Sequence, residues 1–352
     1  MVKSCCILAF AASLAASAAV PGDITPRIGS IEIYGAHKVS LQKIRAALGA
    51  GPGDLLPSRE DAEERIDKVS GVVASRVEAA CCEQQKPILY VGIEERDSPH
   101  VELHPAPAGN AALPSEVLDK YHAFLDAVAG SIRGGNADED LTNGYSLMAD
   151  PECRQIQQAF LPLVEHNLAL IDRVVRDSSD PEQRAIAAYV LQYGPRGPGT
   201  SKIVVNALQW ALRDQDDGVR NNATRALKAV AVGAKLHPEQ QIRIEPTWFI
   251  ELLNSVVWSD RRNASLALVN LTEQRDPEML EELRERALPS IIEMARWHDL
   301  EHALPAFILA GRLAGLDEKT IQQDWIGGDH EEVLKKALKS KGKHLALTGA
   351  GQ

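Results

Sequence analysis

Aromatic residues are scarce in this chain of 352 residues, at 5%, although 45% of the sequence is hydrophobic. The apolar content is therefore mostly aliphatic, with many alanines. This composition argues against a large β-sandwich and favours paired helices, because small side chains let helix axes approach closely. The hydrophobic share is ordinary for a globular protein, so disorder throughout the chain is not expected.

Positive charge is also in short supply. The formal net charge is −11, and lysines and arginines do not gather into a stripe that could follow a phosphate backbone. Nucleic acid is therefore not an expected partner. A group of lysines between residues 335 and 343 lies near the C-terminus. There it complements the dipole of a solvated last helix.

Apolar runs are short, and none reaches the roughly 20 residues that a membrane-spanning helix requires. The first residues combine Lys3, an apolar stretch at 5–12 and the triplet Ala16-Ser17-Ala18. This order is typical of a secretory signal peptide, which we predict over residues 1–18. We therefore expect an exported protein, periplasmic or extracellular, without a transmembrane span.

Cysteines are few and lack the C-x-x-C spacing of a metal site. Once Cys5 and Cys6 leave with the signal peptide, the mature chain keeps Cys81, Cys82 and Cys153. An odd number leaves two alternatives open in an oxidising compartment. Either one disulfide joins Cys153 to Cys81 or Cys82, or the thiols are buried and free, which is our default expectation.

The N-terminal part of the predicted mature chain has a βααββ pattern. Alternating apolar residues predict the strands, and Ser40 and Ser58 are placed to cap two helices. The predicted elements are a strand at 28–34, helices at 41–48 and 62–69, and strands at 72–80 and 88–94.

This order, with its turn after Gly35, the pairs Gly53-Asp54 and Gly71-Val72, and Glu94-Glu95 at the end, resembles the POTRA domain over residues 27–97. That family is a periplasmic module of outer-membrane assembly and secretion proteins. The resemblance implies a chaperone-like or docking module that binds extended polypeptide along a sheet edge. Only one such domain is visible and no barrel strands follow, so membrane insertion is not implied. A generic α+β domain without a substrate is the alternative.

Two segments separate this domain from the rest. Residues 98–113 are rich in proline and predict a linker. Residues 114–151 contain a helix and an acidic loop, unassigned or an N-terminal cap. In this loop Asn136, Asp138, Asp140 and Thr142 alternate like calcium ligands, but the glycine and glutamate of that motif are missing, so we expect a solvated loop.

One spacing recurs through the C-terminal two thirds of the chain. An arginine is followed by small apolar residues at +3 and +6, and a fainter copy begins at Leu300. The successive starts are 36, 41 and 39 residues apart, close to the roughly 40–47 residues of two-helix repeats. The predicted repeat positions are Arg184, Ala187, Arg220, Ala223, Ala226, Leu227, Arg261, Ala264 and Ala267.

Each frame is expected to be the second helix of a pair, with a longer first helix before it. Asp180-Pro181, Asp217-Gly218 and Asp260 mark the expected starts of the second helices. Small residues keep one helix face narrow, and stacked pairs then form a superhelix with an extended concave surface. The predicted first helices are 155–176, 201–213, 247–258 and 283–297.

The run from Asp216 through Val219, Arg220 and Ala223 to Leu227 resembles the second-helix pattern of the HEAT repeat family. The resemblance covers roughly residues 152–316, within an armadillo-like solenoid expected over 152–345. It implies that the arginine joins a polar ladder with an aspartate of the preceding turn, Asp214 or Asp216 for Arg220. We therefore expect these arginines to be structural rather than catalytic.

Motifs for chemistry are weak. His298 and His302 have the i, i+4 spacing of zinc ligands but lack the H-E-x-x-H order, and His298 precedes the expected helix. We predict no catalytic, cofactor-binding or metal-binding residue. Trp210, Trp258 and Trp297 lie near the ends of first helices, where they form either an aromatic binding ladder or, as we favour, helix-helix staples.

The predicted fold is multidomain, a small α+β domain followed by an all-α superhelix. The predicted function is an exported, non-enzymatic scaffold that binds protein or extended peptide through a sheet edge and a solenoid groove. It would be chaperone-like or dock envelope proteins. Two alternatives stay open, an enzyme or metal-dependent site in residues 114–150 and a structural envelope component.

Overall fold

The computed structural model describes residues 26–83, 86–136 and 138–348. The predicted signal peptide, residues 1–18, lies outside the described residues. The described chain forms two compact units. The first unit contains residues 102–248, and the second contains residues 26–101 together with 249–348.

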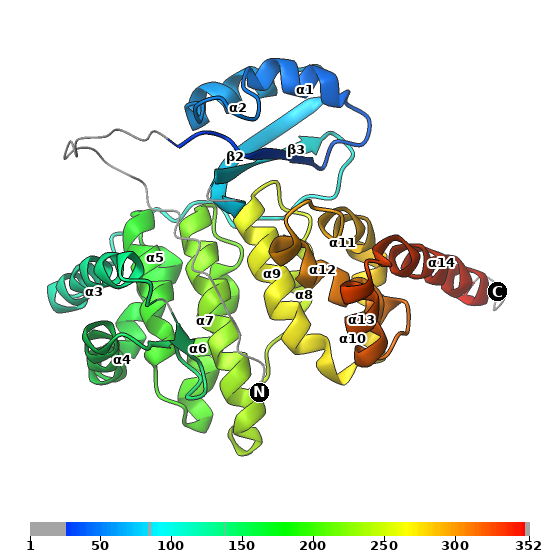
Figure 1. The fold of residues 1–352 in the computed structure, drawn as a ribbon. Helices are drawn as coiled ribbons and strands as arrows, with labels where there is room; N and C mark the ends of the chain where they lie inside the picture. The colour runs from blue at the N-terminus through cyan, green and yellow to red at the C-terminus, as the bar shows by residue number, and fades with distance from the viewer. Residues whose placement is uncertain (1–25, 84–85, 137, 349–352) are drawn as a thin grey trace. The chain divides into compact units, whose positions relative to one another are not determined.

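A small sheet region opens the second unit, as the sequence pattern predicts. The sheet has the order β1-β3-β2, with β1 parallel and β2 antiparallel to the central β3. Figure 1 shows the two helices α1 and α2 on one side of this sheet. The elements are β1 (Ser30–Tyr34), α1 (Leu41–Leu48), α2 (Arg59–Asp67), β2 (Val72–Glu83) and β3 (Lys86–Glu95).

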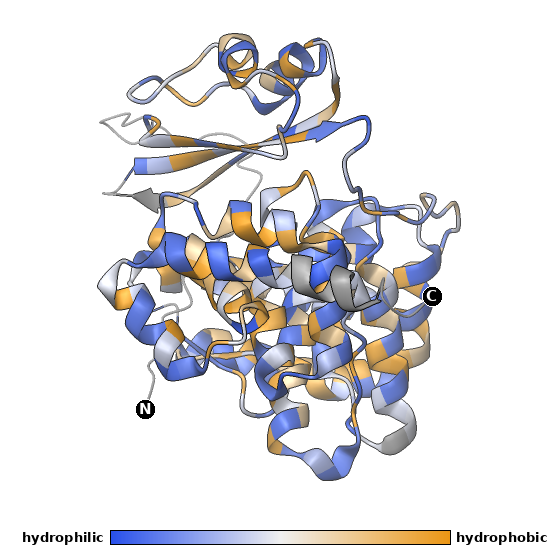
Figure 2. Ribbon diagram, turned by 90° about the vertical axis from the view of Figure 1, so that its right-hand side faces the viewer, coloured by the Kyte–Doolittle hydropathy of each residue, from blue (hydrophilic) through white to orange (hydrophobic). Residues whose placement is uncertain are grey.

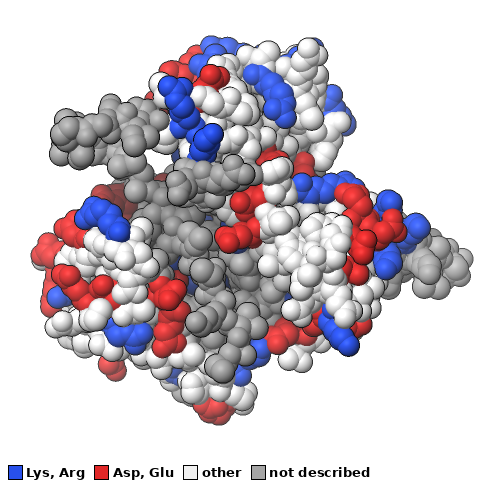
Figure 3. Space-filling model, viewed as in Figure 1, with Lys and Arg blue, Asp and Glu red and all other residues white. Residues whose placement is uncertain are grey.

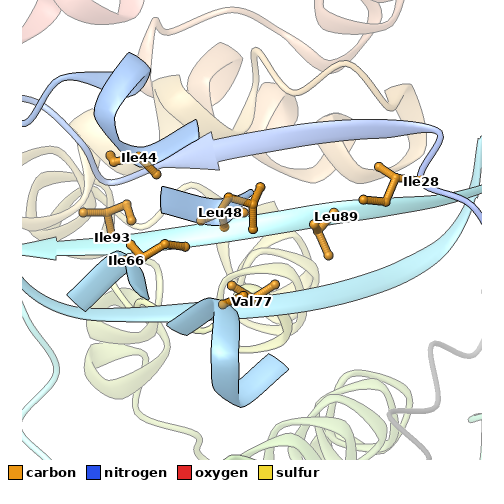
Figure 4. Close-up of a cluster of buried hydrophobic side chains, with 9 residues drawn as sticks. Ile28, Ile44, Leu48, Ile66, Val77, Leu89 and Ile93 are labelled. Atoms are coloured by element: carbon orange, nitrogen blue, oxygen red, sulfur yellow. The ribbon is translucent and has the colours of Figure 1, made fainter. Parts of the chain in front are cut away.

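Alternation along β3 gives the sheet two different faces. Leu89 and Ile93 point toward the helices, where they pack with Ile44, Leu48 and Ile66 in a buried aliphatic core (Figure 4). Because successive side chains of a strand point to opposite faces, Tyr90 lies on the other side of the sheet. Tyr90 is also buried, so both faces of the sheet are covered at this strand.

The second face of the sheet packs against helices of the same unit. Tyr34 Oη donates to Val256 O at 2.8 Å, and Tyr90 Oη is 2.6 Å from His302 Nδ1. A Cβ at Gly92 would lie 1.9 Å from Val256 O, so only glycine permits this approach. Tyr90 also stacks on Trp258 at 4.8 Å between ring centroids.

The first unit begins with helix α3 and continues in helix pairs. Helix α4 packs on α5 and α6 packs on α7, while α5 also contacts α7. The elements are α3 (Ser115–Arg133), β4 (Glu139–Asp140), β5 (Leu147–Met148), α4 (Pro151–Asp177), α5 (Pro181–Val190), η1 (Leu191–Tyr193), α6 (Pro198–Ala211), α7 (Asp217–Leu236) and η2 (Pro238–Gln240).

The helices of residues 249–348, in the second unit, are also arranged in packed pairs. Helix α12 contacts α9, α11, α13 and α14 and forms the centre of this group. The elements are α8 (Thr247–Leu252), which begins at the end of the first unit, α9 (Trp258–Leu271), η3 (Thr272–Gln274), α10 (Pro277–Arg286), α11 (Leu288–Met294), α12 (Leu300–Leu313), α13 (Glu318–Gly327) and α14 (His330–Thr348).

Two predicted first helices differ from the observed ones. The expected helix at 247–258 ends at Leu252, and Trp258 already begins α9. The expected helix at 283–297 is split into α10 and α11 between Arg286 and Leu288. The split occurs just before Pro289, which lacks a backbone N–H and is tolerated only in a first helical turn.

The expected helix starts are also partly corrected. Asp180 caps α5 as predicted, because its side chain accepts from Glu182 N. Helix α7 begins at Asp217, as predicted, and its N-cap is Asp216, whose carboxylate accepts from Val219 N. Asp260 is not a cap but lies in the first turn of α9, where it accepts from Ser255 Oγ.

The helices are amphipathic rather than apolar all round. Figure 2 shows hydrophilic and hydrophobic residues mixed along each of them. Within the part of the chain that the structure describes, no helix has the length and apolarity needed to cross a membrane.

Candidate functional site

The three frame arginines share one contact. Each donates to the backbone carbonyl six residues earlier, at 2.9 Å from Arg184 to Ser178, 2.7 Å from Arg220 to Asp214 and 2.6 Å from Arg261 to Ser255. These carbonyls lie in the loops between paired helices, where helix-end carbonyls have lost their intrahelical partners. The arginine thus ties the first turn of a second helix to the loop before it.

Carboxylates of the following repeat complete two of these contacts. Arg184 donates two hydrogen bonds of 2.7 and 2.8 Å to the Asp214 carboxylate, and Arg261 donates one of 2.9 Å to Glu293. Hydrogen bonds from Arg184 to the Asp214 carboxylate raise the pKa of Arg184 above its ordinary value. A bidentate pair of this kind fixes orientation as well as charge.

Arg220 also contacts the loop before its own helix. Its guanidinium donates to the main-chain carbonyls of Asp214 and Gln215. The Asp214 carboxylate accepts from Arg184, and the Asp216 carboxylate caps α7. The ladder between Arg220 and the carboxylate of Asp214 or Asp216 stays a prediction.

The small residues of the frames lie inside the helix pairs. The arginines are buried beside them, so the frame presents almost no surface to a ligand. The buried repeat positions are Ala187, Ala223, Ala226, Leu227, Ala264 and Ala267.

Exposed recognition chemistry lies elsewhere in the first unit. Trp210 is 38% exposed, with the His104 ring stacked on it at 3.7 Å between centroids and the Arg176 guanidinium 5.2 Å from its ring. Arg213 lies over the Trp248 ring at 4.0 Å. We call Trp210, Arg176, Arg213 and Trp248 the stacked surface, and His104 lies against it.

The stacked surface repeats with the helix pairs. Arg176 ends α4 and Trp210 ends α6, whereas Arg213 follows α6 and Trp248 begins α8. The arginine precedes its tryptophan by 34 residues in one pair and by 35 in the other. Successive repeats therefore present the same cation and ring side by side, which suits carboxylates, backbone carbonyls and flat rings of a bound peptide.

The tryptophans fall into two classes that the sequence does not separate. Trp258 and Trp297 are each 4% exposed and pack against Tyr90, so these two are staples, as we favoured. Trp210 is not buried. Trp248, His104 and the two arginines were missed, although the 34- to 35-residue spacing was available as a signal.

The free edge of the sheet, at β2, is partly closed by side chains. Val77 N donates to Glu63 Oε1 at 2.8 Å, and Arg76 Nη1 donates to Ser75 O at 2.8 Å. Val73, at the bulge that begins the strand, is 54% exposed. Strand addition would have to displace Glu63 or use the part of β2 beyond Val77.

The described residues of 114–150 include one serine paired with a carboxylate. Ser146 Oγ donates to Glu139 at 2.9 Å, and Glu139 also accepts from Arg225 at 3.0 Å. A cavity of about 650 Å³ lined by Asp126, Asp150 and other residues of α3 and α4 lies nearby. In the described residues, no group of three or more His, Cys, Asp or Glu side chains could hold a metal.

The two histidines with zinc-like spacing have separate roles. His298 N donates to Glu32 at 2.8 Å, while the His302 ring bonds Tyr90. Burial, and to a smaller extent Arg262, lowers the pKa of His302 to about 4. His302 is therefore neutral in the folded protein at neutral pH.

The cysteines correct one expectation. Cys153 is buried and free, so the disulfide considered between Cys153 and Cys81 or Cys82 is wrong. Cys81 is itself disulfide-bonded, which also corrects the default of free thiols throughout. Burial raises the pKa of the Cys153 thiol to about 11, and such a thiol is unreactive.

Charge on the face shown in Figure 3 is scattered, and lysines and arginines form no continuous stripe there. No protein-family model matches the chain. No curated protein matches it.

Among solved structures, the chain is similar to a designed armadillo repeat protein at 15% identity, covering 55% of this chain and 96% of that chain, with a TM-score of 0.35. A designed armadillo repeat protein in complex with the peptide (KR)4 is 13% identical over 55% of this chain and 95% of that chain, with a TM-score of 0.33. We draw no conclusion from TM-scores this low. The contacts themselves show a mostly helical, repeat-like chain with a small sheet region near its N-terminus.

Proposed function

We propose that this protein is a non-enzymatic scaffold that binds an extended segment of another protein on the stacked surface. The observation that carries the proposal is Trp210, an exposed indole with an imidazole stacked on it and a guanidinium 5.2 Å from its ring. A rigid, half-desolvated ring beside a fixed cation is the composition of an interface hot spot. The partner is a protein or peptide, and nucleic acid is not proposed.

We also propose the domain families to which the two parts of the chain belong. We propose that residues 27–97 are a POTRA-like domain, supported by two helices on one face of a β1-β3-β2 sheet. We propose HEAT- or armadillo-like repeats over 152–345, supported by the shared arginine contact six residues back.

We propose that the protein is exported to the periplasm or beyond and acts on envelope proteins there, in a chaperone-like or docking role. The disulfide at Cys81 supports an oxidising compartment, in which such bonds persist. The sequence at Lys3 and Ala16-Ser17-Ala18 supports the same location.

Selection from a displayed library of random peptides against the full chain tests the binding role. We expect selected peptides to lose about 30-fold in affinity on Trp210→Ala, the usual cost of removing an aromatic hot spot. The matched control is Trp325→Ala. Trp325 also stacks on a histidine, His330, at 4.3 Å between ring centroids, but it lies in the second unit. Selected peptides that bind Trp210→Ala as well as the unchanged chain would contradict the proposal.

A further inference from the structure

A segment of the chain itself lies against part of the stacked surface. This segment is residues 102–108, which we call the strap, and it contacts Trp210 and Arg213 within the first unit through Glu102 and His104. His104 stacks on Trp210, and His104 N donates to Arg213 O at 2.7 Å. In return Arg213 Nε donates to the carbonyl of Glu102 at 2.9 Å. The strap therefore makes with this surface the kinds of contact that a bound peptide makes, main-chain hydrogen bonds and one stacked ring.

Arg213 contacts two parts of Glu102. Besides the carbonyl, its Nη2 atom lies 3.8 Å from the Glu102 carboxylate. One guanidinium thus contacts an acidic residue through main chain and side chain, while Trp210 contacts the ring two positions later. The strap thus places against the surface an acidic residue followed after one residue by a ring, in the sequence Glu102-Leu103-His104.

The strap is held lightly compared with the residues that follow it. Glu102, Leu103, Pro105, Ala106 and Ala108 are all exposed. Pro105 and Pro107 have no backbone N–H and can add no hydrogen bonds of that kind.

The next residues are anchored instead. Ser179 N donates to Gly109 O at 2.9 Å, and Leu113 N donates to Gln183 Oε1 at 2.8 Å. Ala111 and Leu113 are buried. The strap can therefore leave the stacked surface while residues 109–113 keep their place.

We propose that the strap is an intramolecular ligand, displaced when a partner peptide with an acidic residue two positions before an aromatic ring binds the stacked surface. This inference rests on the proposed function and adds the partner's chemistry and its regulation. A phenylalanine, tyrosine or tryptophan covers more of Trp210 than the imidazole of His104 does, which favours the partner.

Tethering sets the strength of the competition. A ligand joined by a short chain acts at an effective concentration in the millimolar range, so a free peptide of equal intrinsic affinity displaces it poorly. The apparent dissociation constant equals the intrinsic one divided by the fraction of molecules whose surface is open. Weakening the strap must therefore tighten the binding of an added peptide.

A labelled synthetic peptide of residues 98–108 with His104→Trp is the probe, and its affinity is measured by fluorescence anisotropy on the full chain. We expect binding to be about tenfold tighter to the Glu102→Ala/His104→Ala variant than to the unchanged chain. Adding Trp210→Ala to that variant should abolish the gain. A Leu103→Ala variant, which alters an exposed strap residue outside these contacts, should bind like the unchanged chain.

Hydrogen exchange on the unchanged chain gives a second readout that needs no variant. Saturating probe peptide should raise exchange at the His104 amide and leave the Leu113 amide protected. Equal affinity for the unchanged and strap-weakened chains, or a His104 amide that stays protected at saturation, overturns the inference. Either result leaves the proposed function standing if library peptides still depend on Trp210, so the two failures are distinguishable.

Discussion

Arg184 illustrates what can and cannot be predicted at the scale of single residues. Its place in a recurrent frame predicts a structural role, and the structure buries it against Ser178 O and Asp214. The acid that pairs with it lies 30 residues away in the next helix pair. Local spacing predicts that such an arginine needs partners, but the partner depends on how pairs stack, and stacking is a tertiary property.

The stacked surface shows the same limit. Trp210 was noticed in the sequence, but its exposure could not be predicted because Trp258 and Trp297 occupy similar places near helix ends and are buried. What separates them is the sheet. Its tyrosines cover the two buried indoles, whereas Trp210 is contacted by His104 of the strap and by Arg176 and stays 38% exposed.

His302 predicts a pH dependence of stability. Its folded pKa of about 4 is below the roughly 6.5 of an unfolded histidine. As pH falls below about 6.5, the unfolded state binds a proton that the folded state refuses, so stability is lost down to about pH 4. Above pH 7 this histidine contributes no slope.

Urea unfolding between pH 4 and 8 measures this effect. We expect a slope of up to about 1.4 kcal/mol per pH unit from His302. Replacement by glutamine should remove that share of the slope in the second unit. If His302→Gln and the unchanged chain lose stability in parallel on acidification, His302 is not the titrating group.

At the scale of elements, helix existence was predictable and helix boundaries were not. The helix expected within residues 114–151 is α3, Ser115–Arg133, because its apolar face is regular and a proline precedes it. Between Leu252 and Trp258 the same apolar spacing continues, yet the chain turns. Tyr34 of the sheet donates to Val256 O in that turn, and Ser259 of α9 donates to Glu78 of the sheet. The break in the helix therefore reflects tertiary contacts.

Glu63 predicts the behaviour of the sheet edge. Because its carboxylate accepts from Val77 N, removing it leaves an open donor on an edge strand that already has Val73 exposed. Open edges pair with other strands. Glu63→Ala should therefore self-associate at concentrations where the unchanged chain does not, as measured by sedimentation velocity.

The neighbouring Glu64 supplies the control. It is exposed and pairs with Lys68 on the outer face of α2, away from β2. Glu64→Ala removes the same charge and should sediment like the unchanged chain. Association of both variants to the same extent would point to lost charge rather than to the freed edge.

At the scale of the whole molecule, the order of segments along the sequence does not predict which segments pack together. The sheet region comes first in sequence but belongs to the compact unit that also contains residues 249–348. Composition and periodicity act over neighbouring residues, and they carry no information about which distant helices a sheet face selects. The pairing of Tyr90 with Trp258 and His302 spans more than 160 residues and could not be predicted from local pattern.

Two substitutions should therefore perturb two different sets of elements. Trp258→Ala opens a cavity against Tyr90, a change that costs about 3–5 kcal/mol for a buried tryptophan, and it should lower hydrogen-exchange protection in β3 and α12 together. Arg184→Ala leaves Asp214 buried without its partner, at a similar cost, and should lower protection in α5 and α7. Amide exchange by mass spectrometry resolves both sets, because each compact unit opens with its own free energy. If Arg184→Ala lowers protection in β3 as much as in α5, the chain unfolds as one unit. The reason is that a single cooperative unit transmits any destabilisation to every amide it contains.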